Sequence, residues 1–234
     1  MGIWWILFSQ YTFFHLPKGV KRTGERKNII FNGFKELKGV WYQLGNEVRL
    51  KRYLLAFFVY SMAVQTVMLI ATYFGEQEIN WGSVSERTTG LIVSILVIQL
   101  VAIIGATMTA KASKRFGNIN TLMVINILWV FICIYAYFII TPTDFYIAAG
   151  CVGIVMGGIQ ALSRSTYSKF IPETTDTASF FSFYDVAEKF GIVIGTFLYG
   201  FIAQFTGSMR NATIFLGLFF LSGLFLLTRV NKKP

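Results

Sequence analysis

The chain has 234 residues, of which 55% are hydrophobic and 17% aromatic, and its formal net charge is +10. A soluble domain cannot hide that much apolar surface, so the composition excludes a soluble globular protein and predicts an integral membrane protein. The sequence has no cluster of His, Cys and carboxylates, no phosphate-binding loop and no nucleophile elbow. We therefore expect no cofactor, no bound metal and no catalytic activity.

The first segment of the chain, 1–16, is apolar and ends at Pro17, but it is slightly short for a membrane span. Residues 17–52 then form the longest polar stretch and hold ten of the 21 Lys and Arg residues. Within this stretch, NGFKELKGVWYQL has apolar residues at helical spacing, which predicts an amphipathic helix on the membrane surface. We expect its partner to be a lipid bilayer with anionic headgroups and not nucleic acid.

Six further apolar stretches of about 20 residues predict six membrane-spanning helices with short connections. They cover roughly 53–74, 90–110, 119–140, 144–163, 180–205 and 211–230. The predicted fold class is therefore all-α, a multi-pass membrane helix bundle. The predicted domains are the partial apolar helix 1–16, the basic loop 17–52 and the bundle 53–231.

The basic residues are distributed unevenly between the two sides of the predicted bundle. If the six spans alternate, eighteen of the 21 Lys and Arg fall on one side, whereas the other side holds Arg87 and Arg210, and Lys189 lies within a span. Because cytoplasmic loops carry an excess of Lys and Arg, this pattern puts the loop 17–52 and the C-terminus in the cytoplasm.

Polar side chains also occur inside the predicted spans, where they are costly unless they face a cavity or another helix. Tyr60 and Gln65 lie in the first span, Gln99 in the second, Asn126 in the third and Gln160 in the fourth. We interpret these five residues as candidates for a substrate pathway. Hydrogen bonding between helices would explain the same residues equally well.

Small residues indicate where the helices can approach one another. Gly153 and Gly157 are four residues apart in the fourth span, and Gly191 and Gly195 have the same spacing in the fifth. This spacing permits close helix packing. It is compatible both with static packing and with helices that slide or rock.

Three charges lie near the start of the fifth span, in the segment FYDVAEKFGIVIGTFLYGFI. Asp185, Glu188 and Lys189 share one side of a helix because they are three and four residues apart. Lys189 can neutralise one of the two carboxylates. Arg164, at the cytoplasmic end of the preceding span, is the expected partner of the other carboxylate.

The depth of these charges favours some roles over others. If Thr177 or Ser179 caps the helix, Asp185 lies roughly 9–12 Å further along it, near the cytoplasmic boundary of the hydrocarbon. This shallow position favours a charge clamp between two helices, or a cytoplasmic gate, over a proton-coupled carboxylate.

Three stretches carry a family resemblance. They are FVYSMAVQTVMLIATYFGEQE, GGIQALSRSTYSKFIPE and FFSFYDVAEKFGIVIGTFLYG, at 58–78, 157–173 and 180–200. They resemble the vacuole-effluxer-like family of the major facilitator superfamily, the group related to the autophagy-associated vacuolar amino-acid exporter. The superfamily's cytoplasmic turn motif is only partly kept in AKASKRFG, because Ala110 and Lys114 stand where the motif has Gly and Asp.

The resemblance implies a position within a longer fold. GIWWILF, at 2–8, is similar to the end of the sixth helix in that family, and 17–52 to its central cytoplasmic loop. The six predicted spans then correspond to the C-terminal half of a major facilitator fold. The resemblance, strongest to bacterial members, also implies a bacterial inner membrane.

Three functions compete at this point. The first is a secondary transporter that exports amino acids or similar small solutes by alternating access. The second is a non-transporting half-subunit or truncated remnant that requires a separate N-terminal half or a second copy. The third is an intramembrane enzyme, which we disfavour because the sequence has no nucleophile–base pair.

Overall fold

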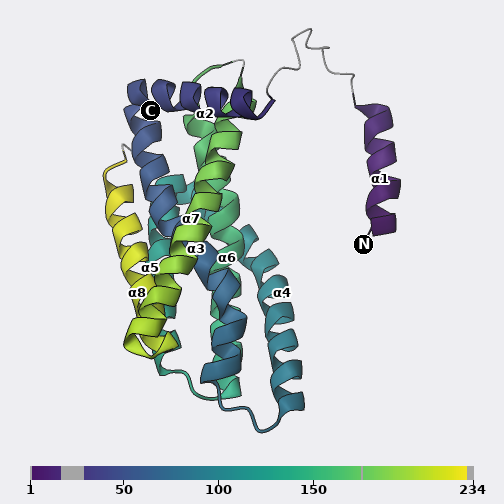
Figure 1. Cartoon of the computed structure of the whole chain (residues 1–234), viewed down its shortest axis with the longest axis vertical. Helices are drawn as coiled ribbons and strands as arrows, with labels where there is room; N and C mark the ends of the chain where they lie inside the picture. Colours follow the sequence, from purple (N-terminus) through teal and green to yellow (C-terminus); the bar gives the residue numbers. More distant parts are fainter. Residues whose placement is uncertain (1, 17–28, 175, 231–234) are drawn as a thin grey trace. The chain divides into compact units, whose positions relative to one another are not determined.

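Six helices in the described part of the chain are long and apolar enough to cross a membrane, which confirms the all-α prediction (Figure 1). They are α3 (Val48–Glu78), α4 (Val84–Phe116), α5 (Asn118–Phe138), α6 (Pro142–Phe170), α7 (Thr177–Thr206) and α8 (Met209–Thr228). Several are longer than the ~20 residues that cross the hydrocarbon, so their ends extend into the interfacial zones.

The computed structural model describes residues 2–16, 29–174 and 176–230. The chain separates into two units, Met1–Lys35 and Glu36–Pro234. The first unit holds α1 (Gly2–His15), an apolar helix without a buried residue, and the start of α2 (Ile29–Asn46). The second unit holds the rest of α2 and the six-helix bundle. Of the predicted basic loop, residues 17–28 lie outside the described residues.

Local sequence signals set the helix boundaries. Thr141 and Asp144 form a reciprocal capping box at the start of α6, and Pro142 occupies its first turn. The expected cap of α7 at Thr177 or Ser179 is wrong, because Asp176 caps this helix by accepting from the Ser179 backbone N–H. The carboxylate of Asp176, one residue before Thr177, accepts this bond, and its negative charge interacts favourably with the positive end of the helix dipole.

Aromatic side chains form the centre of the bundle, whereas apolar residues also cover much of its exterior. Trp129 and Phe220 are fully buried and stack with their ring centroids 5.0 Å apart, joining α5 to α8. By contrast, the apolar side chains along α4 are mostly exposed, including Leu100 and Ile103. Exposed apolar faces of this length suit contact with lipid or with further membrane helices.

Glycines allow α4 and α6 to pack backbone against backbone. A Cβ atom on Gly157 would collide with the Ala102 carbonyl, and one on Gly153 would approach the Ile98 carbonyl oxygen to 2.9 Å. Gly105 makes the reciprocal approach from α4 to α6, which the sequence analysis did not single out.

The second glycine pair lies between α7 and α3. A Cβ atom on Gly195 would collide with Thr66 Oγ1, whereas one on Gly191 would meet Met62 at an ordinary 3.6 Å. The two glycines therefore differ in the space around them. The close contact between α7 and α3 requires a glycine at 195, whereas the position of Gly191 has room for a methyl group.

Gly157→Ala is expected to destabilise the bundle by about 1–2 kcal/mol, because the methyl group would separate two packed backbones. Gly150→Ala on the same helix is the matched control, since nothing lies within 4 Å of its Cβ position. The thermal unfolding midpoint of the purified protein in detergent measures both. Equal midpoints for the two variants would contradict the α4–α6 contact.

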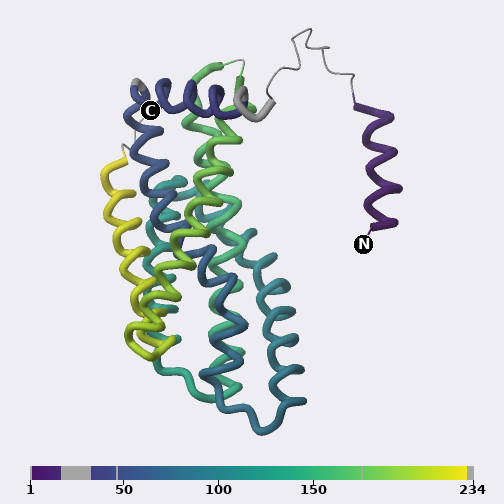
Figure 2. The backbone as a smooth tube through the Cα atoms, viewed as in Figure 1, coloured from purple at the N-terminus to yellow at the C-terminus, as the bar shows by residue number. Residues whose placement is uncertain are grey.

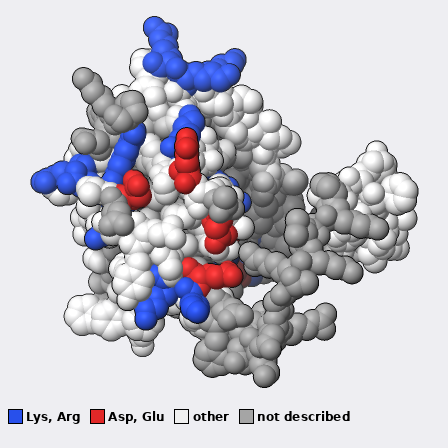
Figure 3. Space-filling view, turned by 90° about the horizontal axis from the view of Figure 1, so that it is seen from above, with Lys and Arg blue, Asp and Glu red and all other residues white. Residues whose placement is uncertain are grey.

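Basic side chains gather at the end of the bundle where α3, α5 and α7 begin, which we call the basic end. Figure 3 looks onto this end and shows Lys and Arg side chains around Asp and Glu side chains. Arg52 Nη1 donates to the Arg229 carbonyl at 3.2 Å, which joins the start of α3 to the end of α8. The basic residues here are Arg49, Lys51, Arg52, Lys111, Lys114, Arg115, Arg164, Lys169 and Arg229.

The 36–46 part of α2 crosses the basic end and leads directly into α3 (Figure 2). Val40 and Leu44 are buried against the bundle, whereas Trp41 is 63% exposed. The amphipathic face predicted from the sequence is therefore divided. One part packs on the other helices, whereas Trp41 stays largely exposed, with its ring centroid 6.1 Å from that of Phe183.

Candidate functional site

A polar cavity of about 650 Å³ lies between α3, α6 and α7, in the half of the bundle nearer the basic end. Its walls combine aromatic rings, hydroxyl and amide groups and two charged side chains, a mixture typical of small-molecule sites. It is lined by Phe57, Tyr60, Ser61, Val64, Gln65, Ile159, Gln160, Ala161, Ser163, Arg164, Ser165, Ser168, Phe181, Tyr184 and Glu188.

Helical spacing explains how these side chains reach one cavity. Phe57, Ser61 and Gln65 recur every four residues on α3, so they share one face of that helix. Gln160 and Arg164 have the same spacing on α6. Two helices thus present polar stripes to a common space, and α7 closes its third side.

A buried hydroxyl network between α3 and α6 adjoins the cavity, which two of its members, Tyr60 and Ser163, line. Tyr60 Oη lies 2.7 Å from Ser163 Oγ, and Tyr53 Oη donates to the Ser163 carbonyl oxygen at 2.7 Å. The ring of Phe57 stacks on Tyr184 with centroids 4.1 Å apart, which joins this network to α7. Sequence analysis named Tyr60 but missed the other members, although Ser163 lies next to Arg164 in a motif that carries the family resemblance.

Arg164, which lines the cavity, forms an ion pair with Asp185, from Nη2 to Oδ1. The guanidinium of Arg164 also lies 5.7 Å from the centre of the Tyr184 ring. The pair connects the end of α6 to the first part of α7.

The sequence predicted that Lys189 neutralises one of the two carboxylates, but the structure shows a different partner for Glu188. Glu188 Oε1 accepts a hydrogen bond from Gln65 Nε2 on α3. Lys189 is exposed and does not line the cavity. Because Arg164 is paired with Asp185, Glu188 contributes a carboxylate whose described partner is a neutral amide.

The predicted pathway residues do not all meet. Tyr60, Gln65 and Gln160 line the cavity, and Gln160 Nε2 lies 3.2 Å from Met68 Sδ. Gln99 lines a separate space of about 230 Å³ between α3, α4 and α6. Asn126 is fully buried, and its Nδ2 donates to the Leu122 carbonyl at 2.8 Å within α5.

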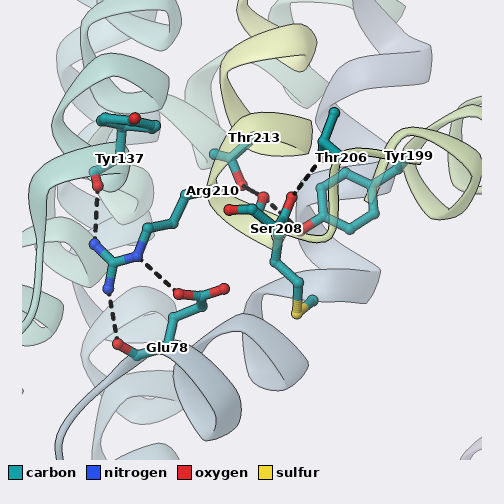
Figure 4. A network of polar contacts seen from close by, with 8 residues as sticks. Glu78, Tyr137, Tyr199, Thr206, Ser208, Arg210 and Thr213 are labelled. Atoms are coloured by element: carbon teal, nitrogen blue, oxygen red, sulfur yellow. Dashed lines mark hydrogen bonds and ion pairs between the residues drawn. The ribbon is translucent and has the colours of Figure 1, made fainter. Parts of the chain in front are cut away.

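A second polar network ties the helices together at the end of the bundle opposite the basic end (Figure 4). Arg210 Nε donates to Glu78 Oε2 at 2.7 Å, Nη2 to the Glu78 carbonyl at 2.8 Å and Nη1 to the Tyr137 carbonyl at 2.9 Å. One guanidinium at the start of α8 thus holds the ends of α3 and α5. Sequence analysis counted Arg210 only as a topology signal, although Glu78 closes the first stretch that carries the resemblance.

Comparison with known proteins identifies the family. The family model described as vacuole effluxer Atg22-like matches residues 1–233. The chain belongs to this family. The resemblance inferred from three stretches of sequence is therefore confirmed.

The relatives of this vacuole effluxer Atg22-like protein are about twice its length. It is 33% identical over 230 residues to the uncharacterized MFS-type transporter YxiO of Bacillus subtilis, covering 98% of this chain and 52% of that protein. It is 25% identical over 251 residues to autophagy-related protein 22 of Eremothecium gossypii, covering 100% of this chain and 48% of that protein. The chain thus matches roughly half of each relative.

A solved structure supports the fold. The Escherichia coli fucose:proton symporter FucP superposes with a TM-score of 0.67 at 15% identity, covering 97% of this chain and 53% of the symporter. The fold of this Atg22-like chain is therefore similar to part of a major facilitator transporter. Which half it corresponds to stays a prediction from the sequence.

Proposed function

We propose that the protein supplies one wall of the substrate pathway of a secondary active transporter, which exports amino acids or similar small solutes by alternating access. The observation that carries this proposal is the cavity, where side chains from α3, α6 and α7 converge. In transporters of this architecture, substrate sites lie between bundles that rock around them. Family membership and the described fold support the same function.

The charge of the cavity supports a preference for solutes with a positively charged group. Arg164 is balanced by Asp185, whereas Glu188 has Gln65, a neutral amide, as its described partner. A protonated amine would supply the missing positive charge and replace the amide as a donor. Amino acids carry such a group, and simple sugars do not.

The distribution of charge supports an orientation. The basic end carries the starts of α3, α5 and α7, so by the positive-inside rule it faces the cytoplasm. The C-terminus, which follows α8 at this end, is cytoplasmic on the same argument. Similarity to the Bacillus subtilis protein favours a bacterial cell membrane.

A second candidate function is that of a half-subunit, which transports nothing without a separate N-terminal half or a second copy. One observation favours it: the described residues that line the cavity come from three helices, so an enclosed pathway needs helices from another half or a second copy. Both candidates use the same cavity.

Reconstitution into proteoliposomes tests both candidates. Radiolabelled amino acids trapped in the lumen should leave faster from vesicles that contain the protein than from empty vesicles. Efflux by this chain alone supports the transporter, whereas efflux only after an N-terminal half of a relative is added supports the half-subunit. If no amino acid moves in either arrangement, the proposed function is wrong.

Glu188→Gln is expected to lower amino-acid efflux by about tenfold, because one charge-assisted contact to an amine is worth about 1.5 kcal/mol or more. Glu173→Gln is the matched control, since Glu173 is exposed in the turn between α6 and α7 and does not line the cavity. Equal initial rates for the two variants would exclude Glu188 from substrate recognition.

A further inference from the structure

A second polar cavity lies at the basic end, on a different set of helices from the proposed substrate pathway. It has a volume of about 260 Å³ and lies between the start of α3, the α4–α5 turn and the end of α6. Among the described residues, its charged lining residues are Arg49 and Lys169, and none of its described lining residues is a carboxylate. Two cations from different helices thus face one small space without an acidic partner in its wall.

Arg49 is held in place but is not neutralised. Its guanidinium lies 4.2 Å from the centre of the Phe170 ring, and Phe170 in turn packs edge-on against Tyr53. The Nε atom is buried and has no hydrogen-bond partner among the described residues. A buried donor without an acceptor costs about 1–3 kcal/mol, so no described acceptor competes for this guanidinium at the wall of the cavity.

Lys169 is anchored to the same wall. Its Nζ lies 3.3 Å from Asn118 Oδ1, which also accepts from Ser113 Oγ at 2.8 Å. The amide of Asn118 donates to Thr166 Oγ1 at 3.0 Å. This chain of contacts fixes Asn118 and directs a second positive charge toward the cavity.

The cavity is also lined by the first turn of α5, a helix of 21 residues. Gly117 precedes this helix with a φ of 84°, a conformation that glycine adopts without strain, and no side chain caps its first turn. The backbone N–H groups of such a turn carry the positive end of the helix dipole and favour anions.

We propose that this cavity binds a phosphate group, either of an anionic lipid headgroup or of a phosphate ion from solution. Arg49 would meet the phosphate with its planar fork of donors, Lys169 would add a second charge, and the uncapped turn of α5 would supply backbone donors. Phe116, 59% exposed, lies at the rim, where it can contact the glycerol or acyl part of a lipid. This inference does not depend on the proposed transport.

Native mass spectrometry of the delipidated protein tests the proposal with three probes: dioctanoyl-phosphatidylglycerol, dioctanoylglycerol and inorganic phosphate. Phosphatidylglycerol should bind with a Kd that Arg49→Gln raises by about tenfold or more. Lys169→Gln should raise this Kd in the same direction. Lys114→Gln is the matched control, because Lys114 is an exposed cation at the same end that does not line the cavity.

The probes distinguish the two sources of phosphate. Binding of phosphatidylglycerol but not of inorganic phosphate identifies a lipid site, and Arg49-dependent binding of both identifies a site for phosphate in general. If dioctanoylglycerol binds as tightly as phosphatidylglycerol, or if Arg49→Gln and Lys114→Gln weaken binding equally, the proposal is wrong. Arg49→Lys keeps the charge and should give an intermediate Kd. A thermal midpoint of Arg49→Gln close to that of the wild-type protein shows that its loss of binding is not loss of folding.

Discussion

Arg164→Ala and Asp185→Asn are each expected to reduce amino-acid efflux by at least about tenfold, while the exchanged pair Arg164→Asp with Asp185→Arg recovers part of the activity. The pair joins the end of α6, where Arg164 lines the cavity, to the first part of α7, so its loss would release the contact between these two helix ends. A factor of ten corresponds to about 1.4 kcal/mol in the relative free energies of the states. Initial efflux rates from proteoliposomes measure the effect.

Stability separates this prediction from simple unfolding. The two side chains are 56% and 49% exposed, and an ion pair this accessible contributes about 0–1 kcal/mol to folding. The thermal midpoints of the three variants should therefore stay close to that of the wild-type protein. Full activity of either single variant would exclude both a clamp and a gate at this position.

A gate and a fixed clamp make opposite predictions for a cross-link. Cysteines at 164 and 185 remove the ion pair, so the reference is the residual efflux of this double variant before a short bifunctional thiol reagent is added. The cross-link should stop that residual efflux if the helix ends must separate in each cycle, and should leave it unchanged if the contact is static. Cys133 and Cys151 are first replaced by Ala, because both are free thiols.

The fold was predictable because membrane helices leave a strong signal in the sequence. Every span must satisfy its own backbone hydrogen bonds, so each appears as a long apolar run between polar turns. The helix bounds were less predictable, since the apolar run marks only the hydrocarbon. The start of α7 is an example. The sequence predicted Thr177 or Ser179 as its N-cap, but Asp176 is the cap, because capping depends on the backbone conformation of each residue, which the residue types alone do not give.

The candidate site was predictable only where helical spacing determined which residues share a face. Spacing grouped Asp185 with Glu188, and the contact expected between Arg164 and a carboxylate of the next helix is the ion pair with Asp185. Polarity alone could not separate Gln65, which lines the cavity, from Asn126, which is buried within α5. That distinction depends on how each helix is rotated in the bundle.

Apart from the pair of Arg164 and Asp185, the partners of the charged side chains were the least predictable feature. Spacing favoured Lys189 as a partner for one of the carboxylates, but Glu188 accepts from Gln65 on another helix. In the same way Arg210 and Glu78 are 132 residues apart in sequence, and no local pattern joins them. Contacts between helices follow from their packing, which the pattern within one helix does not encode.

The contact between Arg210 and Glu78 leads to the largest expected loss of stability. Both side chains are about one-fifth exposed, and the guanidinium also donates hydrogen bonds to the backbone carbonyls of Glu78 and Tyr137. Arg210→Met removes all three hydrogen bonds and leaves the Glu78 carboxylate largely buried without its partner. We expect it to destabilise the protein by about 2–4 kcal/mol, because breaking one side of a buried pair strands the other charge.

Thermal unfolding in detergent provides the measurement, with an expected fall in midpoint of roughly 5–10 °C for Arg210→Met. Arg87→Met is the matched control: Arg87 pairs with Glu76 at 3.4 Å at the same end of the bundle, but these side chains are 36% and 42% exposed. Its midpoint should change little. The double variant Arg210→Met with Glu78→Met should be more stable than Arg210→Met alone, because it removes the stranded carboxylate. If the double variant is instead less stable, the carboxylate is not the source of the loss, and the two side chains stabilise the helix ends through independent contacts.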